Sequence, residues 1–242
     1  MNKNSNTYTV VYLIIAVVVV GTALAFTSMS LKDKQQMNAD ADKMKQILSS
    51  LHINTTDKDI KNIFDKTIVK QLIVDESGKI VKSIETDSGD NSVFDIDVSN
   101  EVKQSADKRQ LPVFVAKMED NTQKYVIPLY GAGLWGPIWG YIAVDQNGST
   151  VYGAYFSHAS ETPGLGAEIE TDHFRSEFDN KQLFKDGQFY PIVVVKKGQK
   201  PNNSNADYID GISGGTITSK GVGTMLDNCL TPYKLFLQSL TK

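Results

Sequence analysis

A run of 22 residues over 10–31 carries no charged side chain, and it constrains the fold more than any other feature. At about 1.5 Å of rise per residue, a helix of this length spans roughly the 30 Å hydrocarbon core of a bilayer. The run is apolar on all sides rather than along one stripe, which argues against a buried helix of a soluble domain. The sequence therefore predicts one N-terminal transmembrane helix over 10–31, preceded by a short segment, 1–9.

A cleaved signal peptide is the alternative for this segment. Lys3 supplies a positive start, and Ala23-Leu24-Ala25 resembles a small-residue cleavage site. The apolar run continues past Ala25 as far as Leu31, which is longer than a signal peptide needs, so a retained anchor is the preferred interpretation. Lysines flank both ends of the run, and the orientation in the membrane does not follow from charge.

The rest of the composition is that of an ordinary globular chain of one or two folded units. With 25 Lys+Arg against 28 Asp+Glu, the formal charge is −3, so a basic surface for nucleic acid is not expected. A single cysteine, Cys229, excludes an intrachain disulfide framework, and the three histidines are too scattered to form a metal-binding pattern. We therefore expect neither nucleic acid nor a metal as a ligand.

Apolar periodicity predicts the elements of the remaining chain. Three- and four-residue spacing indicates helices over residues 37–51, 57–69, 172–184 and about 219–240, the last kinked or split by Pro232. Strand-like runs cover residues 70–84 as a hairpin, then 93–98, 113–118, 125–130, 138–144, 151–157 and 190–195. Because hairpins outnumber strand-helix-strand units, the predicted class is α+β, a mainly antiparallel sheet with flanking helices.

Two glycine motifs resemble catalytic or cofactor signatures but lack a required partner. Residues 131–136 fit G-x-G-x-x-G, yet they lead into a strand-like segment rather than the helix of a dinucleotide site. The alternatives are a turn that admits a flat ligand beside Trp135 or Trp139, or an ordinary turn. Residues 211–215 fit G-x-S-x-G, but all three histidines precede Ser213, whereas the hydrolase histidine follows the nucleophile. No catalytic residue is assigned.

The stretch DGISGGTITS, residues 210–219, places hydroxyl groups among glycines where the terminal helix is expected to begin. Thr218 or Ser219 can cap that helix. The free N–H groups and the dipole at a helix N-terminus favour a phosphate nearby. A polar loop with a simple helix cap is the alternative. The functional interpretation is an anion site beside an accessible Thr216 hydroxyl.

The same stretch resembles the acceptor motif of proteins modified by a dedicated flavin transferase, Asp-x-x-Ser/Thr-Gly-Ala-Thr/Ser. The matching residues are Asp210, Ser213, Gly214, Gly215 and Thr216, with Gly215 where the motif usually has Ala. Together with LYGAGLWGPIWGYIAVD, HASETPGLGAEI and one N-terminal anchor, the motif makes the chain similar to the C subunits of the Na⁺-translocating NADH:quinone reductase. The G subunits of the related ferredoxin:NAD reductase, or a cofactor-free envelope binding module, are the alternatives.

The resemblance implies a flavoprotein subunit of a Na⁺-transporting oxidoreductase that relays electrons between NADH oxidation and ubiquinone reduction, itself binding neither NADH nor quinone. The implied cofactor is FMN, esterified through its phosphate to Thr216. The implied place is the bacterial inner membrane, with residues 1–9 cytoplasmic, 10–31 spanning, and 32–242 extracytoplasmic, FMN being held by about 123–242. The implied partners are the other membrane subunits, membrane lipid and, during maturation, the flavin transferase.

We expect the flavin ring to lie against a loop rich in glycine and against one aromatic side chain. The expected surroundings are Trp135, Thr162, Pro163, Gly164, Leu165 and Gly166. Thr218 is expected to donate a hydrogen bond to the phosphate, whose negative charge the helix N-terminus would offset. A plain connector is the alternative for the 162–166 segment.

Overall fold

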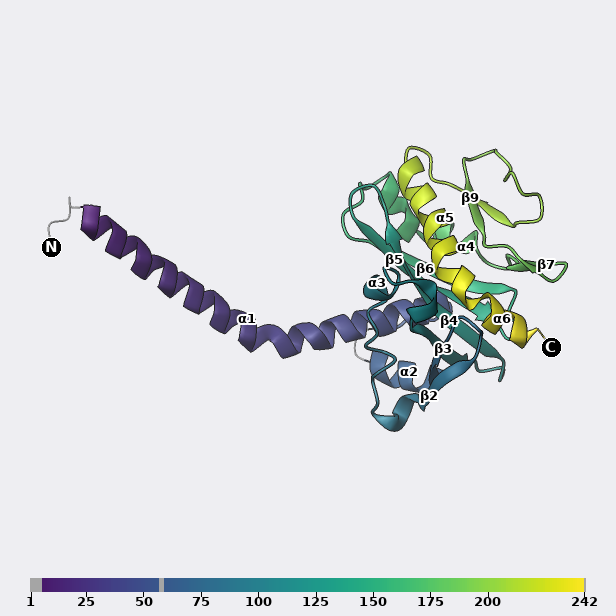
Figure 1. Ribbon diagram of the computed structural model, residues 1–242, viewed down its shortest axis with the longest axis horizontal. Coiled ribbons are helices and arrows are strands. Elements are labelled where there is room, and N and C mark those ends of the chain that lie inside the picture. Colours follow the sequence, from purple (N-terminus) through teal and green to yellow (C-terminus); the bar gives the residue numbers. More distant parts are fainter. Residues whose placement is uncertain (1–5, 57–58, 242) are drawn as a thin grey trace. The chain divides into compact units, whose positions relative to one another are not determined.

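A computed structural model describes residues 6–56 and 59–241 of the chain. The chain divides into two compact units, Met1–Lys43 and Met44–Lys242, each described by itself. The longest helix, α1 (Asn6–Ser50), contributes residues to both units (Figure 1). Residues 1–5 of the expected cytoplasmic segment, and Asp57 and Lys58 of an expected helix, lie outside the described residues.

Helix α1 is continuous, so the prediction of separate helices over 10–31 and 37–51 was wrong. Residues 32–36 are Lys, Asp, Lys, Gln and Gln, and because no Gly or Pro occurs among them, nothing interrupts the helical hydrogen bonds. By length and composition, α1 can cross a membrane: an 18-residue window has a mean hydropathy of 2.6 and no buried residue. Its large apolar side chains over 10–31 are exposed, as a lipid-facing helix requires.

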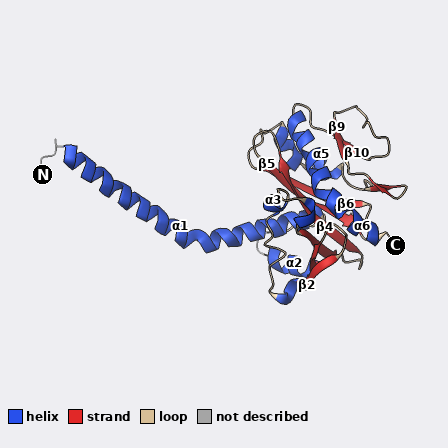
Figure 2. Cartoon of the chain, viewed as in Figure 1, coloured by secondary structure: helices blue, strands red, loops and turns tan. Residues whose placement is uncertain are grey.

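The second unit is built on a six-stranded sheet in the order β2-β1-β3-β4-β5-β6, with every neighbouring pair antiparallel. The strands, red in Figure 2, are β1 (Ile68–Val74), β2 (Ile80–Glu85), β3 (Leu111–Lys117), β4 (Gln123–Ala132), β5 (Pro137–Asp145) and β6 (Val151–His158). The α+β class and the mainly antiparallel sheet are confirmed. The central strands β3 and β5 are buried along most of their length because both faces of the sheet are covered.

The small elements depart most from the sequence prediction. Residues 93–98 form no strand but local turns that lead into α3 (Val98–Glu101), because the Asp97 side chain accepts the Ser99 N–H and caps that helix. Val93 and Phe94 still enter the core, so their apolar character reflects burial alone. Short helical turns complete the set: η1 (Thr86–Ser88), η2 (Ala106–Lys108) and η3 (Gly166–Glu170).

Three further predicted elements are shorter than expected. The helix over 57–69 is α2 (Ile60–Thr67), and the helix over 172–184 ends early as α4 (Asp172–Ser176). The chain leaves α4 because Asn180, at φ 64°, turns its backbone N–H onto the Val151 carbonyl. The strand over 190–195 is β9 (Val193–Val195), which pairs in parallel with β10 (Tyr208–Asp210), after the hairpin of β7 (Phe184–Lys185) and β8 (Gln188–Phe189).

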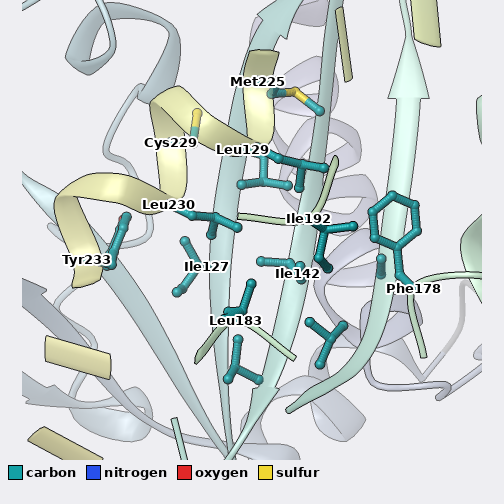
Figure 3. Packing of buried hydrophobic residues seen from close by; sticks show 14 of the residues in the cluster. Ile127, Leu129, Ile142, Phe178, Leu183, Ile192, Met225, Cys229, Leu230 and Tyr233 are labelled. Carbon is teal, nitrogen blue, oxygen red and sulfur yellow. The ribbon is translucent and has the colours of Figure 1, made fainter. Parts of the chain in front are cut away.

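The C-terminal helices cover one face of the sheet. Pro232 splits them as predicted, into α5 (Thr216–Leu230), η4 (Thr231–Tyr233) and α6 (Lys234–Leu240). Figure 3 shows side chains of α5 and η4 packed on strands β4 and β5: Met225, Cys229, Leu230 and Tyr233 face Ile127, Leu129 and Ile142. Cys229 is therefore a core residue, 5% exposed.

The other face of the sheet is covered by the end of α1, by α2 and by the 93–94 turn. Phe64 and Phe94 pack edge to face, and Phe94 does the same with Phe114 of β3. Trp139 of β5 lies on this side and donates its indole N–H to the Gln46 side chain, 3.0 Å away. Of the two tryptophans considered as stacking faces for a ligand, Trp139 therefore has a structural role.

The turn between β5 and β6 packs so closely against α6 that it requires a glycine. The predicted Asn147-Gly148 hairpin is present, with the Gly148 N–H bonded to the Asp145 carbonyl at 2.8 Å. Gly148 has φ +68°, and a Cβ there would overlap the Leu237 carbonyl of α6. Both the backbone conformation and the space require glycine at this position.

We predict that Gly148→Ala destabilises the full-length protein well beyond the effect of φ alone. Gly187 is the matched control, because it has φ +75° but no atom lies within 4 Å of the place that a Cβ would occupy. Gly187→Ala should cost about 1–2 kcal/mol, the left-handed penalty. Gly148→Ala should cost about 1–3 kcal/mol more, from overpacking against α6. Thermal unfolding in detergent measures the difference, and equal unfolding midpoints for the two variants would contradict it.

Candidate functional site

The N-terminus of α5 is the centre of the candidate site. The helix begins at Thr216 with Gly215 as its N-cap, so the prediction that Thr218 or Ser219 caps the helix was wrong. The helical hydrogen bonds already begin at Gly215, whose carbonyl accepts the Ser219 N–H at 2.9 Å, after Gly214 has turned the chain at φ +80°. The Ser219 hydroxyl instead holds the loop by accepting the Ile212 N–H at 2.9 Å.

Thr216, the predicted acceptor, occupies the first helical position and is exposed. Ser213 and Gly214 beside it are exposed too, and among the described residues no hydrogen bond occupies the Thr216 hydroxyl. Gly215 is buried, and a Cβ there would lie 3.1–3.2 Å from Ile212 and the Leu165 backbone. The glycine at the position where the acceptor motif usually has Ala is thus packed tightly, while the threonine remains accessible.

Glu161 joins three segments around this helix start. Its carboxylate accepts the Trp135 N–H at 2.8 Å and the Thr218 hydroxyl at 2.5 Å, and the residue is 5% exposed. Its own N–H donates to His158 Nδ1 at 3.1 Å. The β4–β5 turn, the 159–165 loop and the first turn of α5 are therefore held by one buried side chain.

Two motif glycines owe their identity to Glu161. A Cβ at Gly133 would lie 2.5 Å from its carboxylate, and a Cβ at Gly166 would overlap both that carboxylate and the Thr218 hydroxyl. Gly131 and Gly136 are likewise crowded by neighbouring side chains. A Cβ at Gly131 would lie 2.7 Å from the Met225 side chain, and a Cβ at Gly136 would lie 2.7 Å from the Ser160 hydroxyl. Residues 131–136 form the connection between β4 and β5, as expected from the strand-like segment that follows them. Their glycines leave space for neighbouring side chains of the protein itself.

Burial raises the pKa of Glu161, but the hydrogen bonds from Thr218 and from the Trp135 and Leu134 N–H groups outweigh it. The net effect holds the pKa of this carboxyl below its ordinary value of 4.5. Glu161 is therefore ionised at neutral pH inside the protein, where several donors replace the water it has lost. A charged, fully bonded carboxylate of this kind fixes local geometry.

Four exposed apolar side chains surround the exposed start of α5. Trp135 is 65% exposed, Ile217 57%, Leu134 47% and Leu165 42%, although most large apolar side chains of this unit are buried. The Trp135 N–H and the Thr218 hydroxyl both donate to Glu161, and Leu134 and Ile217 are the chain neighbours of these two donors. Leu165 lies close to Gly214, since a Cβ at Gly214 would lie 2.7 Å from its side chain. We name Leu134, Trp135, Leu165 and Ile217 the apolar rim. Its exposed area is suited to a flat aromatic ligand.

Two cavities flank the 211–213 segment that precedes α5. The first, about 720 Å³, is lined by Thr216 and Ser213, by β9 and by the loop after it, with Lys196, Lys197, Lys200 and Lys220. The second, about 530 Å³, is lined by Gly164, His173 and Asp210 among others. We name them the lysine cavity and the acidic cavity. Of these two cavities, it is the lysine cavity that Thr216 lines.

The remaining predicted residues are brought to the same region with different roles. Thr162, Pro163 and Gly164 form an exposed turn in which the Thr162 carbonyl accepts the Leu165 N–H at 3.1 Å. Asp210 ends β10 and donates its N–H to Glu177 at 2.8 Å. Thr218 is 1% exposed and its hydroxyl is engaged by Glu161, which argues against the expected hydrogen bond to a phosphate.

The other chemistry considered from sequence finds little support in the geometry. Ser213 and His173 line the acidic cavity together, but no hydrogen bond joins their side chains in the described part of the chain. Across residues 6–56 and 59–241, no cluster of three His, Cys, Asp or Glu side chains is arranged to hold a metal ion.

Sequence reasoning missed Glu161 and the four lysines of the lysine cavity. Glu161 lies within the HASETPGLGAE stretch, where an acid between a serine and a Thr-Pro turn gives no sign of burial. The lysines fall in a polar loop and in a helix turn 20 residues further on, and only the fold brings them together. The run Lys196-Lys197-x-x-Lys200 was the available signal.

Exposed apolar side chains and a cavity lined by lysines suit this region to a flat, anionic ligand, and comparison with known proteins gives the class of the domain. A family model described as "FMN-binding domain" matches residues 133–231, which contain the β4–β5 turn, the 159–166 loop and α5. The class that this match gives for residues 133–231 is that of FMN-binding domains.

Relatives that match most of the chain identify the family. The Na⁺-translocating NADH-quinone reductase C subunit from Vibrio anguillarum is 32% identical over 79% of this chain and 77% of its own length. The crystal structure of the corresponding C subunit from Parabacteroides distasonis superposes with a TM-score of 0.76 at 45% identity, covering 86% of this chain and 96% of that one. Shewanella oneidensis NqrC gives a TM-score of 0.63 at 25% identity, covering 84% and 98%. The chain belongs to the family of Na⁺-translocating NADH-quinone reductase C subunits.

We predict that Glu161→Gln destabilises the protein at neutral pH by about 1–3 kcal/mol, because a neutral amide replaces the charged acceptor of the hydrogen bonds. The pKa of Glu161 is lowered in the folded state, so its stabilising effect is present above pH 4.5 and is lost as pH falls through the folded pKa. The difference in unfolding midpoint between wild type and variant should therefore shrink as pH falls below 4.5. Glu119→Gln, on an exposed turn, is the control. A difference that is independent of pH would refute the role of the charge.

Proposed function

We propose that this chain is a membrane-anchored flavoprotein subunit that carries FMN esterified through its phosphate to Thr216. The observation that carries the proposal is an exposed, unbonded threonine hydroxyl at the first position of a 15-residue helix, beside a cavity and an apolar rim. Membership in the C-subunit family supports it independently. The G subunit of the ferredoxin:NAD reductase is the less favoured alternative, since the relatives from Vibrio and Parabacteroides are named as C subunits.

The residues at the site fit such a cofactor in three respects. The lysine cavity, about 720 Å³, falls within the roughly 300–1,000 Å³ of cavities that hold small molecules. The apolar rim offers Trp135 and Leu165 to an aromatic ring. The helix N-terminus and nearby lysines offset negative charge on a phosphate.

Each residue then has a defined part in holding the cofactor. Thr216 provides the attachment point, and Gly214 and Gly215 keep its hydroxyl open to a modifying enzyme. Glu161 keeps the helix start and the Trp135 turn at a set separation, with Thr218 as its bonding partner. FMN itself, when bound, supplies reversible electron transfer. A phosphate tether leaves the ring free to meet partners on the exposed side.

The proposed role of the subunit is electron relay within a multi-subunit Na⁺-translocating oxidoreductase. The relatives bear the name of an NADH-quinone reductase subunit, which supports a place in such a complex. Neighbouring membrane subunits would be the electron donor and acceptor, and a flavin transferase would be the maturation partner. Residues 131–136 join β4 to β5, and the proposal leaves NADH binding to other subunits of the complex.

We predict that the protein, co-expressed with a flavin transferase, fluoresces as a denatured gel band and gains the mass of one FMN ester. Thr216→Ala should abolish both signals, because it removes the acceptor oxygen. Ser213→Ala should retain them, since Ser213 is equally exposed and only three residues away. In-gel fluorescence and intact mass spectrometry provide the measurement.

Two outcomes would count against this assignment. Covalent fluorescence that persists in Thr216→Ala would place the linkage elsewhere. A wild-type chain that stays colourless and unmodified, despite co-expression, would favour the cofactor-free binding module instead.

The orientation of the domain is a separate part of the proposal. We place the N-terminal end of α1 in the cytoplasm and the second unit, Met44–Lys242, on the extracytoplasmic side of the inner membrane, with α1 as the anchor. Exposed apolar side chains over 10–31 support the anchor, whereas the flanking charges do not determine its direction.

We predict that a C-terminal alkaline phosphatase fusion is active and that a C-terminal green fluorescent protein fusion is dim, because each reporter folds on one side of the membrane only. Western blots of both fusions control for expression. The reverse pattern would place the domain in the cytoplasm, and release of the protein by carbonate washing would indicate a cleaved leader instead of an anchor.

A further inference from the structure

The lysine cavity is strongly biased in charge. Four lysines line it and no aspartate or glutamate does, although the chain as a whole has a formal charge of −3. The lining lysines are Lys196, Lys197 and Lys200 from the loop after β9 and Lys220 from α5. All four are exposed, and no salt bridge in the described part of the chain involves any of them.

The acidic cavity on the other side of the 211–213 segment has the opposite bias. Its carboxylates are Glu168, Glu177 and Asp210, against a single lysine, Lys197. An anion beside this segment is therefore repelled on one side and attracted on the other. Thr216 opens onto the attractive side, so charge alone selects the direction for a negative group attached there.

The two hydroxyl groups that follow Thr216 in the first turn of α5 both take part in hydrogen bonds within the protein. Thr218 donates to Glu161, and the Ser219 hydroxyl accepts the Ile212 N–H, with both residues buried. A phosphoryl group on Thr216 therefore cannot accept from the Thr218 hydroxyl without breaking its hydrogen bond to Glu161, whereas the Ser219 hydroxyl, which also lines the lysine cavity, keeps its own O–H to donate. The lysines across the cavity are the cationic donors at this site.

We propose that the lysine cavity is an anion subsite that binds the phosphate group of the flavin, with Lys196, Lys197, Lys200 and Lys220 as its cationic donors. The inference rests on the proposed function for the identity of the ligand. It assigns the phosphate and ribityl part to the lysine side of the 211–216 segment and the ring to the apolar rim. Lysine ammonium groups bind phosphate as point charges, and the N-terminus of α5 adds to the same field.

This subsite has a consequence that does not require the covalent bond. Because the lysines are unpaired and gathered before any ligand binds, the unmodified protein should bind FMN non-covalently and should prefer it to riboflavin, which lacks the phosphate. The preference should fall with ionic strength, since exposed charges are screened within about 8–10 Å at 0.1–0.15 M salt. The residual affinity for riboflavin would report on the apolar rim.

The test uses full-length Thr216→Ala in detergent, with FMN and riboflavin as probes and quenching of flavin fluorescence as the readout. One variant combines Lys196→Gln, Lys197→Gln, Lys200→Gln and Lys220→Gln. The matched control removes as many charges outside the cavity, through Lys108→Gln, Lys117→Gln, Lys185→Gln and Lys234→Gln. Circular dichroism confirms that both variants are folded.

We expect Thr216→Ala to bind FMN at least tenfold more tightly than riboflavin in 50 mM salt. The cavity variant should lose most of that ratio, the control variant should keep it, and 0.5 M salt should reduce it in both the parent and the control. Equal affinity for the two probes, absence of binding by both, or equal loss in the cavity and control variants would each overturn the inference.

These outcomes are separable from the fate of the proposed function. Covalent modification is scored on the wild-type chain with a flavin transferase, whereas the subsite is scored on a chain that cannot be esterified at Thr216. A wild-type protein that is modified at Thr216, together with a Thr216→Ala protein that shows no preference for FMN, would uphold the proposed function and remove the subsite.

Discussion

A single buried carboxylate, that of Glu161, organises the functional end of this domain. It binds the backbone of the β4–β5 turn and the hydroxyl of Thr218, and its lowered pKa keeps it charged at neutral pH. Burying a charged group costs free energy, so the surrounding chain must supply hydrogen-bond donors and space for the carboxylate. Gly133 and Gly166 supply the room, which explains glycines that at first resemble a ligand-binding motif. The accessible Thr216 is a product of this arrangement, because the helix start is fixed without using its hydroxyl.

Around the start of α5, apolar, cationic and acidic side chains occupy different places. Apolar side chains lie around the helix start, lysines line one cavity beside it, and carboxylates line the other. A cofactor with an aromatic ring and a phosphate matches the first two surfaces and is excluded from the third. The family to which the chain belongs gives that match a biological setting, because the electron carrier that we propose would need its ring at an exposed face and its phosphate tether held in place.

Periodicity predicted the elements whose burial follows a regular pattern. Strands β3 to β6 follow from short runs of strand-forming residues, the Asn147-Gly148 hairpin follows from turn chemistry, and the break at Pro232 follows from its missing N–H. Errors arose where a tertiary contact overrides the local pattern. Val93 and Phe94 belong to a strand-like run but are buried in the core, where Phe94 packs on Phe64, and the helix expected over 172–184 gives way to turns before Asn180 bonds to β6. Helix α1 is longer than predicted because polar residues with high helix propensity continue it.

By itself, the sequence determined the membrane-length apolar helix, the antiparallel α+β class and the candidate acceptor Thr216, since these depend on hydropathy, period and a contiguous motif. The tertiary structure alone decided that the helix begins at Thr216 rather than after it, that Thr218 is engaged by Glu161, and that Lys220 joins three lysines of a distant loop. The physical reason is that burial and electrostatic fields depend on groups far apart in the chain. No local pattern shows which carboxylate will lose its water or which ammonium groups will share a cavity.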